Sequence, residues 1–150
     1  MIGESVTKPM EILLVEDGLT DARVTIYALR RSNVHHRLTL VRSVEEALKF
    51  INREGVFSRA PKPDLLLLDM MLPDGCGLDV LEAMNVSDAD DRPTTVVLTA
   101  SQDPGLRQRC HELHVHDYMN KPVSEQDFMR VVRDHKKLMI HTTPMISASP

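Results

Sequence analysis

Aromatic residues are scarce in this chain of 150 residues, which has two tyrosines, three phenylalanines and no tryptophan. This scarcity argues against a surface that stacks single-stranded bases. No apolar run approaches the roughly 20 residues that a membrane-spanning helix needs. Neither sign of charge dominates, since the net charge is −4. The composition therefore gives no general electrostatic reason to bind nucleic acid or an anionic membrane.

Cysteine is also rare, and only Cys76 and Cys110 are present. Two cysteines in a chain without a signal-peptide pattern predict reduced thiols and a cytoplasmic location. The length fits one domain with a sizeable core. We expect residues 1–9 to be a flexible leader, residues 10–138 to be the folded domain, and residues 139–150 to be a C-terminal tail or arm.

Five short apolar runs are predicted to be strands, and they cover residues 11–15, 37–41, 64–68, 94–98 and 117–119. The first, third and fourth are continuous enough to be buried on both faces of a parallel sheet, whereas the second is more polar, as an edge strand is. An amphipathic helical pattern follows each run. Because parallel neighbours need crossover helices, this alternation predicts a doubly wound α/β fold with five strands and five helices.

The predicted helices carry recognisable starts and apolar stripes. Thr20, Ser43, Asp103 and Ser124 are expected to cap four of them, and the remaining helix covers residues 77–84. The last helix has an apolar stripe that extends as far as Leu138.

Polar residues follow several of the predicted strands directly. Glu16 and Asp17 follow the first, Asp69 the third, Thr99 the fourth and Lys121 the fifth. The carboxyl ends of parallel strands share one edge of the sheet, where ligands bind in such folds. Carboxylates suit a hard ion such as Mg²⁺, and an ammonium and a hydroxyl suit phosphoryl oxygens. The set predicts a site that receives a phosphoryl group.

Four segments carry a family resemblance, and they read ILLVEDGLTDA, PDLLLLDMMLPDGCGLDVLEAM, TTVVLTAS and DYMNKPV. The chain resembles the receiver domain of two-component response regulators over about residues 10–138. It is most similar to the single-domain regulators that are paired with phytochrome kinases. The resemblance implies a flavodoxin-like sheet with the strand order 2-1-3-4-5. Chemotaxis receivers have the same strand order.

The resemblance also implies a phosphoryl-accepting centre with a bound metal. Asp69 would be phosphorylated by a sensor histidine kinase or a phosphotransfer protein. Asp17 and Asp69 would bind Mg²⁺ directly, Glu16 through a water, and Met71 through its carbonyl oxygen. These assignments make the protein a phosphoacceptor for signalling rather than an enzyme that acts on other substrates.

Four further residues take roles from the same resemblance. Lys121 would bind the acyl phosphate, and the peptide bond between Lys121 and Pro122 would be cis. Thr99 would hydrogen-bond the phosphoryl group, and Tyr118 would turn inward in response. This movement would change a protein-interaction face. A homodimer through the face of the fourth and fifth helices, or through a swapped C-terminal arm, is expected.

Other functions remain open from the sequence. One is an Mg²⁺-dependent phosphohydrolase with an aspartyl-phosphate intermediate, although Met71 stands where such enzymes normally have a second acid. Another is a degenerate receiver that binds partners without phosphate. His111, His114 and His116 are interpreted as solvated side chains, because no second ligand cluster accompanies them.

Overall fold

A computed structural model describes residues 8–84, 92–99 and 103–141. Five parallel strands form one sheet in the order β2-β1-β3-β6-β7. These are β1 (Met10–Val15), β2 (His36–Val41), β3 (Leu65–Asp69), β6 (Thr94–Thr99) and β7 (Asp117–Asn120). Since β6 and β7 are the fourth and fifth predicted strands, the order 2-1-3-4-5 is confirmed, and so is the edge position of the second strand.

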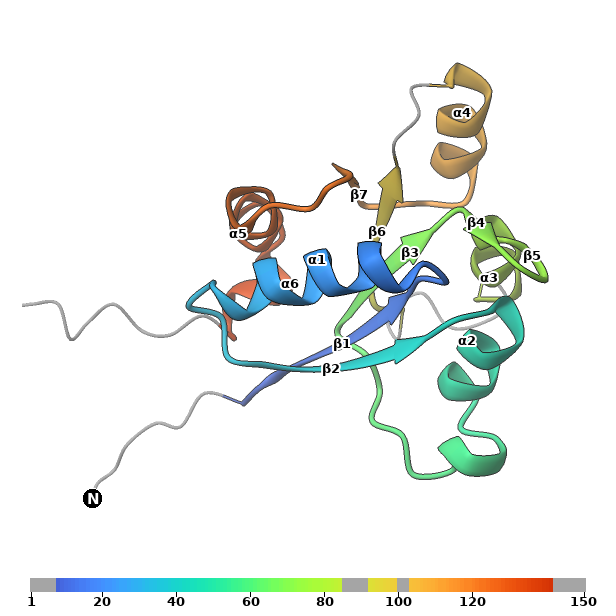
Figure 1. Ribbon diagram of the computed structural model, residues 1–150, viewed down its shortest axis with the longest axis horizontal. Helices are drawn as coiled ribbons and strands as arrows, with labels where there is room; N and C mark the ends of the chain where they lie inside the picture. The colour runs from blue at the N-terminus through green and yellow to red at the C-terminus, as the bar shows by residue number, and fades with distance from the viewer. Residues whose placement is uncertain (1–7, 85–91, 100–102, 142–150) are drawn as a thin grey trace, which may run out of the picture.

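Helices cover both faces of this sheet (Figure 1). On one face lie α1 (Leu19–Arg30), α5 (Glu125–Asp134) and α6 (Lys136–Met139), and on the other lie α2 (Val44–Ile51), α3 (Gly77–Met84) and α4 (Pro104–Glu112). The chain also forms a 3-10 turn, η1 (Gly55–Phe57), and a small hairpin of β4 (Met71–Leu72) and β5 (Gly75–Cys76). No helix within the described residues has the length and apolar character to cross a membrane.

The central strand β3 shows why its sequence is continuously apolar. Leu65 and Leu67 pack in the core under α1 and α5, whereas Leu66 and Leu68 pack in the core under α2 and α3. All four side chains are fully enclosed. Burying each one stabilises the fold by about 1.5 to 3 kcal/mol before entropy is counted. This strand therefore holds its last residue, Asp69, on the most firmly packed part of the sheet.

Three of the predicted helix caps are confirmed. Side-chain oxygens of Ser43, Asp103 and Ser124 each accept a hydrogen bond from a backbone N–H in the first turn of the following helix. The prediction of Thr20 as a cap is wrong, because α1 already begins at Leu19. The N–H of the preceding Gly18 instead donates to the side chain of Glu16, which turns the chain toward the helix earlier.

The prediction of five helices is also wrong, because the described residues contain six α-helices. The last predicted helix is divided at His135, whose backbone is extended. His135 Nε2 lies 2.9 Å from Asp117 Oδ2, and this contact ties the break to β7. Leu138 is buried as predicted, but it belongs to α6. The packing continues to His141, which is only 2% exposed.

Candidate functional site

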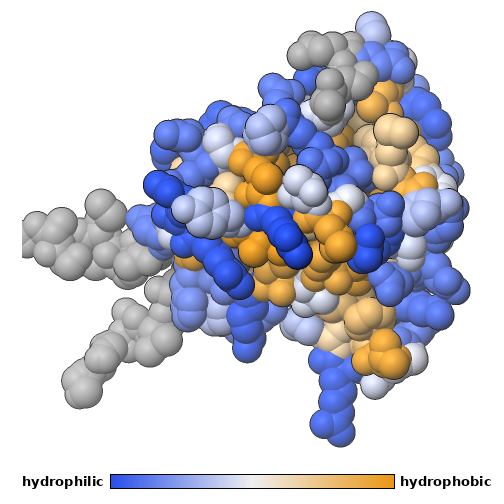
Figure 2. Space-filling view, viewed as in Figure 1, coloured by the Kyte–Doolittle hydropathy of each residue, from blue (hydrophilic) through white to orange (hydrophobic). Residues whose placement is uncertain are grey.

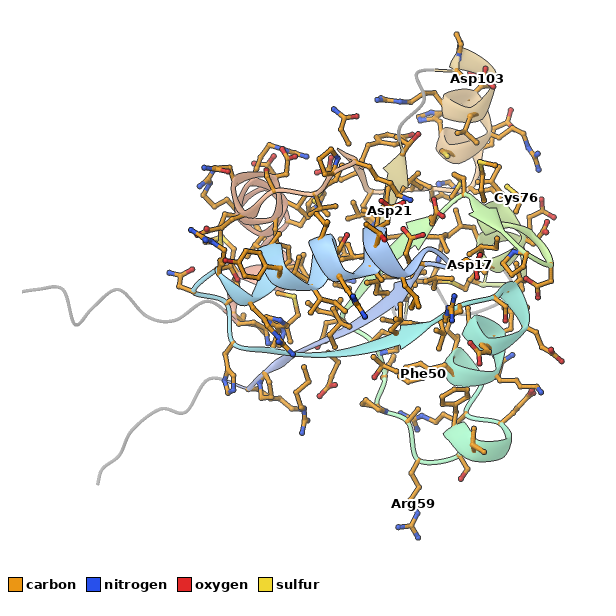
Figure 3. The ribbon with its side chains drawn as sticks, in the orientation of Figure 1. Asp17, Asp21, Phe50, Arg59, Cys76 and Asp103 are labelled. Atoms are coloured by element: carbon orange, nitrogen blue, oxygen red, sulfur yellow. The ribbon has the colours of Figure 1, made fainter. Side chains whose placement is uncertain are left out.

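A cleft of about 790 Å³ opens at the carboxyl edge of the sheet. Its walls come from the segments after β1, β3, β6 and β7 and from the first turns of α1 and α4. Six predicted site residues line it, namely Glu16, Asp17, Asp69, Met71, Thr99 and Lys121. In Figure 3, Asp17 and Asp21 lie on the α1 side of this edge and Cys76 lies on the β5 side.

Lys121 connects the carboxylates of the cleft. Its ammonium nitrogen lies 2.8 Å from Glu16 Oε1, 3.1 Å from Asp69 Oδ1 and 3.4 Å from Asp21 Oδ2. The peptide bond that follows Lys121 is cis, as predicted for Pro122. The Lys121 backbone N–H donates to the carbonyl oxygen of Thr99 at 3.1 Å, so the lysine is fixed to β6 as well. One cation thus faces three acids from three different elements.

Burial and charge act together on this ion pair. Burial raises the pKa of Glu16, and the charge of Asp69 adds to this, while Lys121 and the Gly18 N–H oppose it. Burial alone would lower the pKa of Lys121, but the pairs with Glu16 and Asp69 raise it above its ordinary value. Lys121 therefore stays protonated at neutral pH. Glu16 is 2% exposed and meets Lys121 as an ion pair across the floor of the cleft.

The backbone behind Asp69 explains how its carboxylate is aimed into the cleft. Asp69 is the last residue of β3 and pairs with Leu98 of β6, and it is 8% exposed. The N–H of Gly77 donates to the carbonyl of Met70 at 2.9 Å. A Cβ atom on Gly77 would lie against the carbonyl oxygen of Asp69 and 2.7 Å from Met70 Cε. Only glycine at position 77 lets α3 start this close to the strand end.

Asp17 lies at the mouth of the cleft and is engaged elsewhere. Its Oδ1 lies 3.5 Å from an Arg42 nitrogen, and the same guanidinium group donates to the Asp17 carbonyl at 2.7 Å. Within the described residues, no three histidine, cysteine or acidic side chains gather in the arrangement of a closed metal site. The donor set nevertheless fits Mg²⁺, which keeps several waters and takes only one or two protein carboxylates.

Thr99 and Met71 both line the cleft but differ in exposure. Thr99 ends β6 and is 7% exposed. Met71 is 83% exposed and pairs with Cys76 in the β4–β5 hairpin. An apolar side chain at this position supplies no acid or amide to activate an attacking water.

Tyr118 does not line the cleft and packs, half-buried, against the core on the α4 side of the sheet. The guanidinium carbon of Arg107 lies 4.0 Å from the centre of its ring, which is a cation–π contact with α4. Burial raises the pKa of Tyr118, and a hydrogen bond with the Cys110 thiol contributes. The ring therefore packs against α4 through Arg107.

Several contacts of the cleft were not predicted from the sequence. Asp21 contacts Lys121, and Arg42 holds Asp17. Asp74 accepts hydrogen bonds from the N–H groups of Val44 and Glu45, which ties the loop after β3 to α2. The spacing of Asp21, one helical turn after Asp17, was the available signal for the first of these.

The remaining histidine and cysteine side chains are given no role in the predicted chemistry of the cleft. His116 accepts a hydrogen bond from the Thr95 N–H through Nδ1, which gives this ring a place at the end of the sheet. Both Cys76 and Cys110 are free thiols. Burial raises the pKa of Cys110, so it is held as a neutral thiol in the core.

Known proteins are similar to this chain in both fold and sequence. Residues 12–133 match the family model described as response regulator receiver domain. Response regulator Rcp1 from Synechocystis sp. is 31% identical over 140 residues, which make up 93% of this chain and 95% of Rcp1. The solved Mn²⁺-bound form of Rcp1 gives a TM-score of 0.72 at 32% identity, covering 91% of this chain and 98% of that structure.

Two other solved structures of response regulators are similar to this chain. The bacteriophytochrome response regulator RtBRR gives a TM-score of 0.77 at 33% identity, covering 95% of this chain and 86% of that structure. The phosphorylated cyanobacterial phytochrome response regulator RcpA gives a TM-score of 0.73 at 30% identity, covering 95% of this chain and 98% of that structure. The chain therefore belongs to the response regulator receiver domain family of two-component signalling, and it is similar to phytochrome response regulators.

Proposed function

We propose that Asp69 accepts a phosphoryl group from a sensor histidine kinase or a phosphotransfer protein. A carboxylate oxygen of Asp69 attacks phosphorus, the bond between phosphorus and the donor imidazole breaks, and an acyl phosphate forms. The observation that supports this proposal is the pairing of Asp69 with Lys121 at 3.1 Å inside a cleft lined with other acids. Lys121 stays beside the same oxygens before and after transfer, so it neutralises the phosphoryl group that arrives.

The proposal includes a magnesium ion. Asp17, Asp69, the carbonyl of Met71 and, through a water, Glu16 would hold Mg²⁺, which offsets negative charge on the transferring group when it is bound. The Asp17 side chain is half-exposed and its carboxylate makes a long contact of 3.5 Å with Arg42, so the carboxylate is able to turn into the cleft at little cost. The Mn²⁺-bound form of the relative Rcp1 supports a divalent ion here.

Thr99 and Tyr118 would carry the signal away from Asp69. The Thr99 hydroxyl donates to a phosphoryl oxygen, and Tyr118 leaves Arg107 to fill the space behind it. Because Arg107 and Cys110 belong to α4, this movement changes the surface formed by α4, β7 and α5. A homodimer through this surface or through the C-terminal arm is part of the proposal. Sedimentation with and without a phosphoryl mimic tests it, and a monomer in both conditions would contradict it.

A partner surface adjoins the cleft. Leu19, Val24 and Tyr27 of α1 are exposed, and Leu19 lies beside the cleft residue Gly18. Figure 2 shows apolar side chains gathered near the centre of this face, with hydrophilic side chains around them. Such a patch beside the phosphoacceptor suits docking of a kinase domain. The similarity to RtBRR and RcpA favours a phytochrome kinase as that partner.

The free thiols favour a cytoplasmic location.

Incubation with Mg²⁺ and acetyl phosphate tests the phosphoacceptor role. Intact mass should rise by one phosphoryl group in the wild type, and hydroxylamine should remove it. Asp69→Asn should show no such adduct, whereas Asp134→Asn, which changes an exposed aspartate on α5, should be modified like the wild type. An adduct of equal yield in Asp69→Asn would overturn the assignment.

The same preparation distinguishes a signalling protein from a phosphohydrolase. We expect each chain to carry at most one phosphoryl group and to lose it slowly. We expect no sustained hydrolysis of phosphomonoesters, because Met71 provides no second acid. Multiple turnover on p-nitrophenyl phosphate that depends on Asp69 would instead support the phosphohydrolase.

A further inference from the structure

The guanidinium group of Arg42 holds Asp17 at two points. One of its terminal nitrogens donates to the Asp17 carbonyl oxygen at 2.7 Å, and the same nitrogen lies 3.5 Å from the carboxylate oxygen Oδ1. Asp17 lines the phosphoacceptor cleft, whereas Arg42 is not among the described residues that line it. Arg42 directly follows β2, so it reaches Asp17 from outside the cleft.

Backbone contacts fix the position from which the Arg42 side chain extends. The Arg42 N–H donates to Glu46 Oε1 at 2.8 Å, in the first turn of α2. The carbonyl of the preceding residue, Val41, accepts the Glu16 N–H at 3.0 Å. In Figure 3, Asp17 lies on the side of the cleft that faces the start of α2. Because the segments after β1 and β2 are tied together in this way, the guanidinium group is held beside Asp17.

The acids of the cleft are divided between two cations. The described lining of the cleft contains five carboxylates and one cation, Lys121. Lys121 forms ion pairs with Glu16, Asp21 and Asp69. The Asp17 carboxylate is paired with Arg42 instead. Arg42 thus offsets the charge of a cleft acid that Lys121 does not pair with.

The contact between the guanidinium group and the Asp17 carboxylate opposes metal binding. A carboxylate that serves as a metal ligand has to give up its contact with Arg42, so the free energy of that contact is subtracted from the free energy of binding. A guanidinium group also repels a divalent cation close to it. The hydrogen bond to the Asp17 carbonyl does not involve the carboxylate, so it does not have to break when the carboxylate turns.

On the basis of the magnesium site in the proposed function, we propose that Arg42 is a positioning residue that sets how tightly the cleft binds a divalent cation. Its hydrogen bond to the Asp17 carbonyl holds the turn after β1 in place, while its charge competes for the Asp17 carboxylate. The two effects have opposite signs. Loss of the hydrogen bond loosens the turn and weakens metal binding, whereas loss of the charge strengthens metal binding. A purely structural role for Arg42 gives only the first effect.

Arg42→Gln separates the two effects, because glutamine is uncharged but keeps an N–H donor for the Asp17 carbonyl. Calorimetric titration of the full chain with MgCl₂, together with amide NMR shifts at Asp17 and Asp69, measures the dissociation constant. Arg42→Gln should bind Mg²⁺ about twofold to fivefold more tightly than the wild type, which corresponds to the loss of a half-exposed ion pair. This gain should shrink at high salt, because salt screens exposed charges. Arg42→Lys keeps the charge and should bind Mg²⁺ like the wild type.

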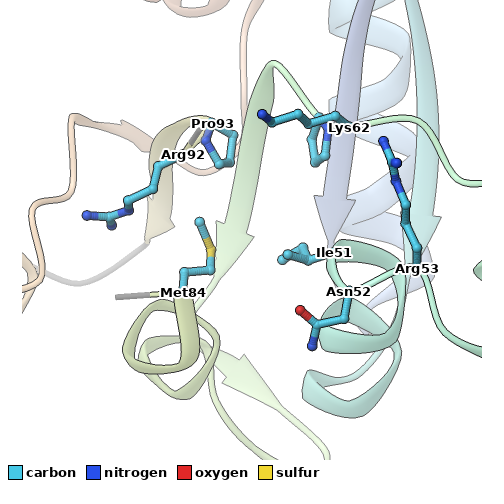
Figure 4. Close-up of a pocket in the computed structure, with 8 residues that line it drawn as sticks. Ile51, Asn52, Arg53, Lys62, Met84, Arg92 and Pro93 are labelled. Atoms are coloured by element: carbon cyan, nitrogen blue, oxygen red, sulfur yellow. The ribbon is translucent and has the colours of Figure 1, made fainter. Parts of the chain in front are cut away.

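Arg37→Gln is the matched control. Arg37 lies in the same strand, and its guanidinium group pairs with an acid of β1 in the same way, at 2.6 Å from Glu11 Oε2. It lies about 16 Å from Arg42, at about 3.3 Å per residue along the strand, which exceeds the Debye length of about 8 Å at physiological salt. Arg53→Gln is a second control, because Figure 4 shows Arg53 beyond the end of α2 that lies away from Arg42. Both variants should bind Mg²⁺ like the wild type.

Failure of the magnesium site and failure of the role of Arg42 give different results. A wild type that does not bind Mg²⁺ would overturn the metal site, and the role of Arg42 with it. A wild type that binds Mg²⁺ while Arg42→Gln binds it equally or more weakly would overturn the role of Arg42 alone. An equal gain in Arg42→Gln and Arg37→Gln would also overturn that role, since the gain would then come from the net charge of the chain.

Discussion

The ammonium of Lys121 lies 2.8 Å from Glu16 Oε1, although the two residues follow strands that are not neighbours in the sheet. Glu16 follows β1 and Lys121 follows β7, and β3 and β6 lie between them. Asp69, at the end of β3, shares the same ammonium. The pair therefore spans the cleft across the sheet, and its single ammonium offsets part of the charge of two buried carboxylates.

Lys121→Met is expected to lower the free energy of unfolding by about 2 to 4 kcal/mol at neutral pH, because two enclosed carboxylates lose their cation. Added Mg²⁺ should restore part of this loss by mass action, since it supplies charge to the same acids. Urea unfolding with a chelator and then with Mg²⁺ measures both effects.

Lys49→Met is the control for that experiment. Lys49 pairs with Glu45 on the exposed face of α2 at 3.5 Å, so its loss should cost less than about 0.5 kcal/mol. Mg²⁺ should make no difference to the gap between Lys49→Met and the wild type. If both lysine variants unfold alike, Lys121 does not neutralise the cleft.

A second prediction concerns Asp117 and pH. Burial raises the pKa of Asp117, but hydrogen bonds from Arg130, His135 and the Tyr118 N–H outweigh it and hold the pKa below its ordinary value. A carboxylate whose pKa is depressed on folding stabilises the protein above about pH 4, and this contribution is lost as pH falls through the folded value.

Asp117→Asn should therefore be about 1 to 2 kcal/mol less stable than the wild type near pH 7, and the difference should vanish in acid. Chemical unfolding at a series of pH values measures it. Asp134→Asn removes an exposed partner of the same Arg130 and should show almost no difference at any pH. A gap for Asp117→Asn that stays constant down to low pH would contradict the argument.

The strands of the sheet and the central residues of the site could be predicted from the sequence, because both follow from patterns that are local in the chain. A continuous run such as 64–68 is expected only in a strand buried on both faces, and β3 has all four leucines enclosed. The polar residues after such runs must meet at one edge, and Glu16, Asp69, Thr99 and Lys121 do line one cleft. The strand order, in contrast, was taken from family resemblance, since periodicity cannot order strands.

Features that depend on particular side-chain contacts were missed. The start of α1 is set by the local hydrogen bond from the Gly18 N–H to the Glu16 side chain, and the break before α6 is set by the contact of His135 with Asp117, 18 residues earlier in the chain. Helical patterns in the sequence continue through both places. The strands β4 and β5 are two residues long, too short for alternation to be visible. The domain boundary near residue 138 stays a prediction, although His141 packs beyond it.

Gly77→Ala should damage both the fold and the site. The new methyl group would meet the Asp69 carbonyl and Met70, so the end of β3 has to move. We expect a loss of about 1 to 3 kcal/mol, and slower phosphorylation by acetyl phosphate because the carboxylate is displaced. Thermal unfolding and the rate of adduct formation measure these effects.

Gly105→Ala is the matched control for Gly77→Ala. Gly105 lies in the first turn of α4, and among the described residues a Cβ there meets only Asp103 Oδ1, at 3.4 Å. Alanine favours a helix more than glycine does, so this variant should be as stable as the wild type or up to about 1 kcal/mol more stable. If Gly77→Ala behaves in the same way, the space behind Asp69 does not position it.

His141 ties three separate segments together at the amino end of the sheet. Its Nδ1 lies 2.6 Å from the Lys8 carbonyl oxygen, and its own carbonyl accepts the His35 N–H at 3.3 Å. Its Nε2 lies 3.6 Å from Asp64 Oδ2. These contacts close the entries to β1, β2 and β3 together, so the residue stabilises the edge of the sheet that lies farthest from the cleft.

His141→Ala is expected to cost about 2 kcal/mol, because it leaves a small cavity and an unpaired carbonyl. Ile140→Ala, which changes a side chain that is 71% exposed, should cost less than about 0.5 kcal/mol. Urea unfolding gives the two free energies, and hydrogen exchange should show faster opening at His35 and Met10 in the first variant only, because the Met10 N–H donates to His35. Equal stability of the two variants would show that the contacts of the His141 side chain do not stabilise the fold.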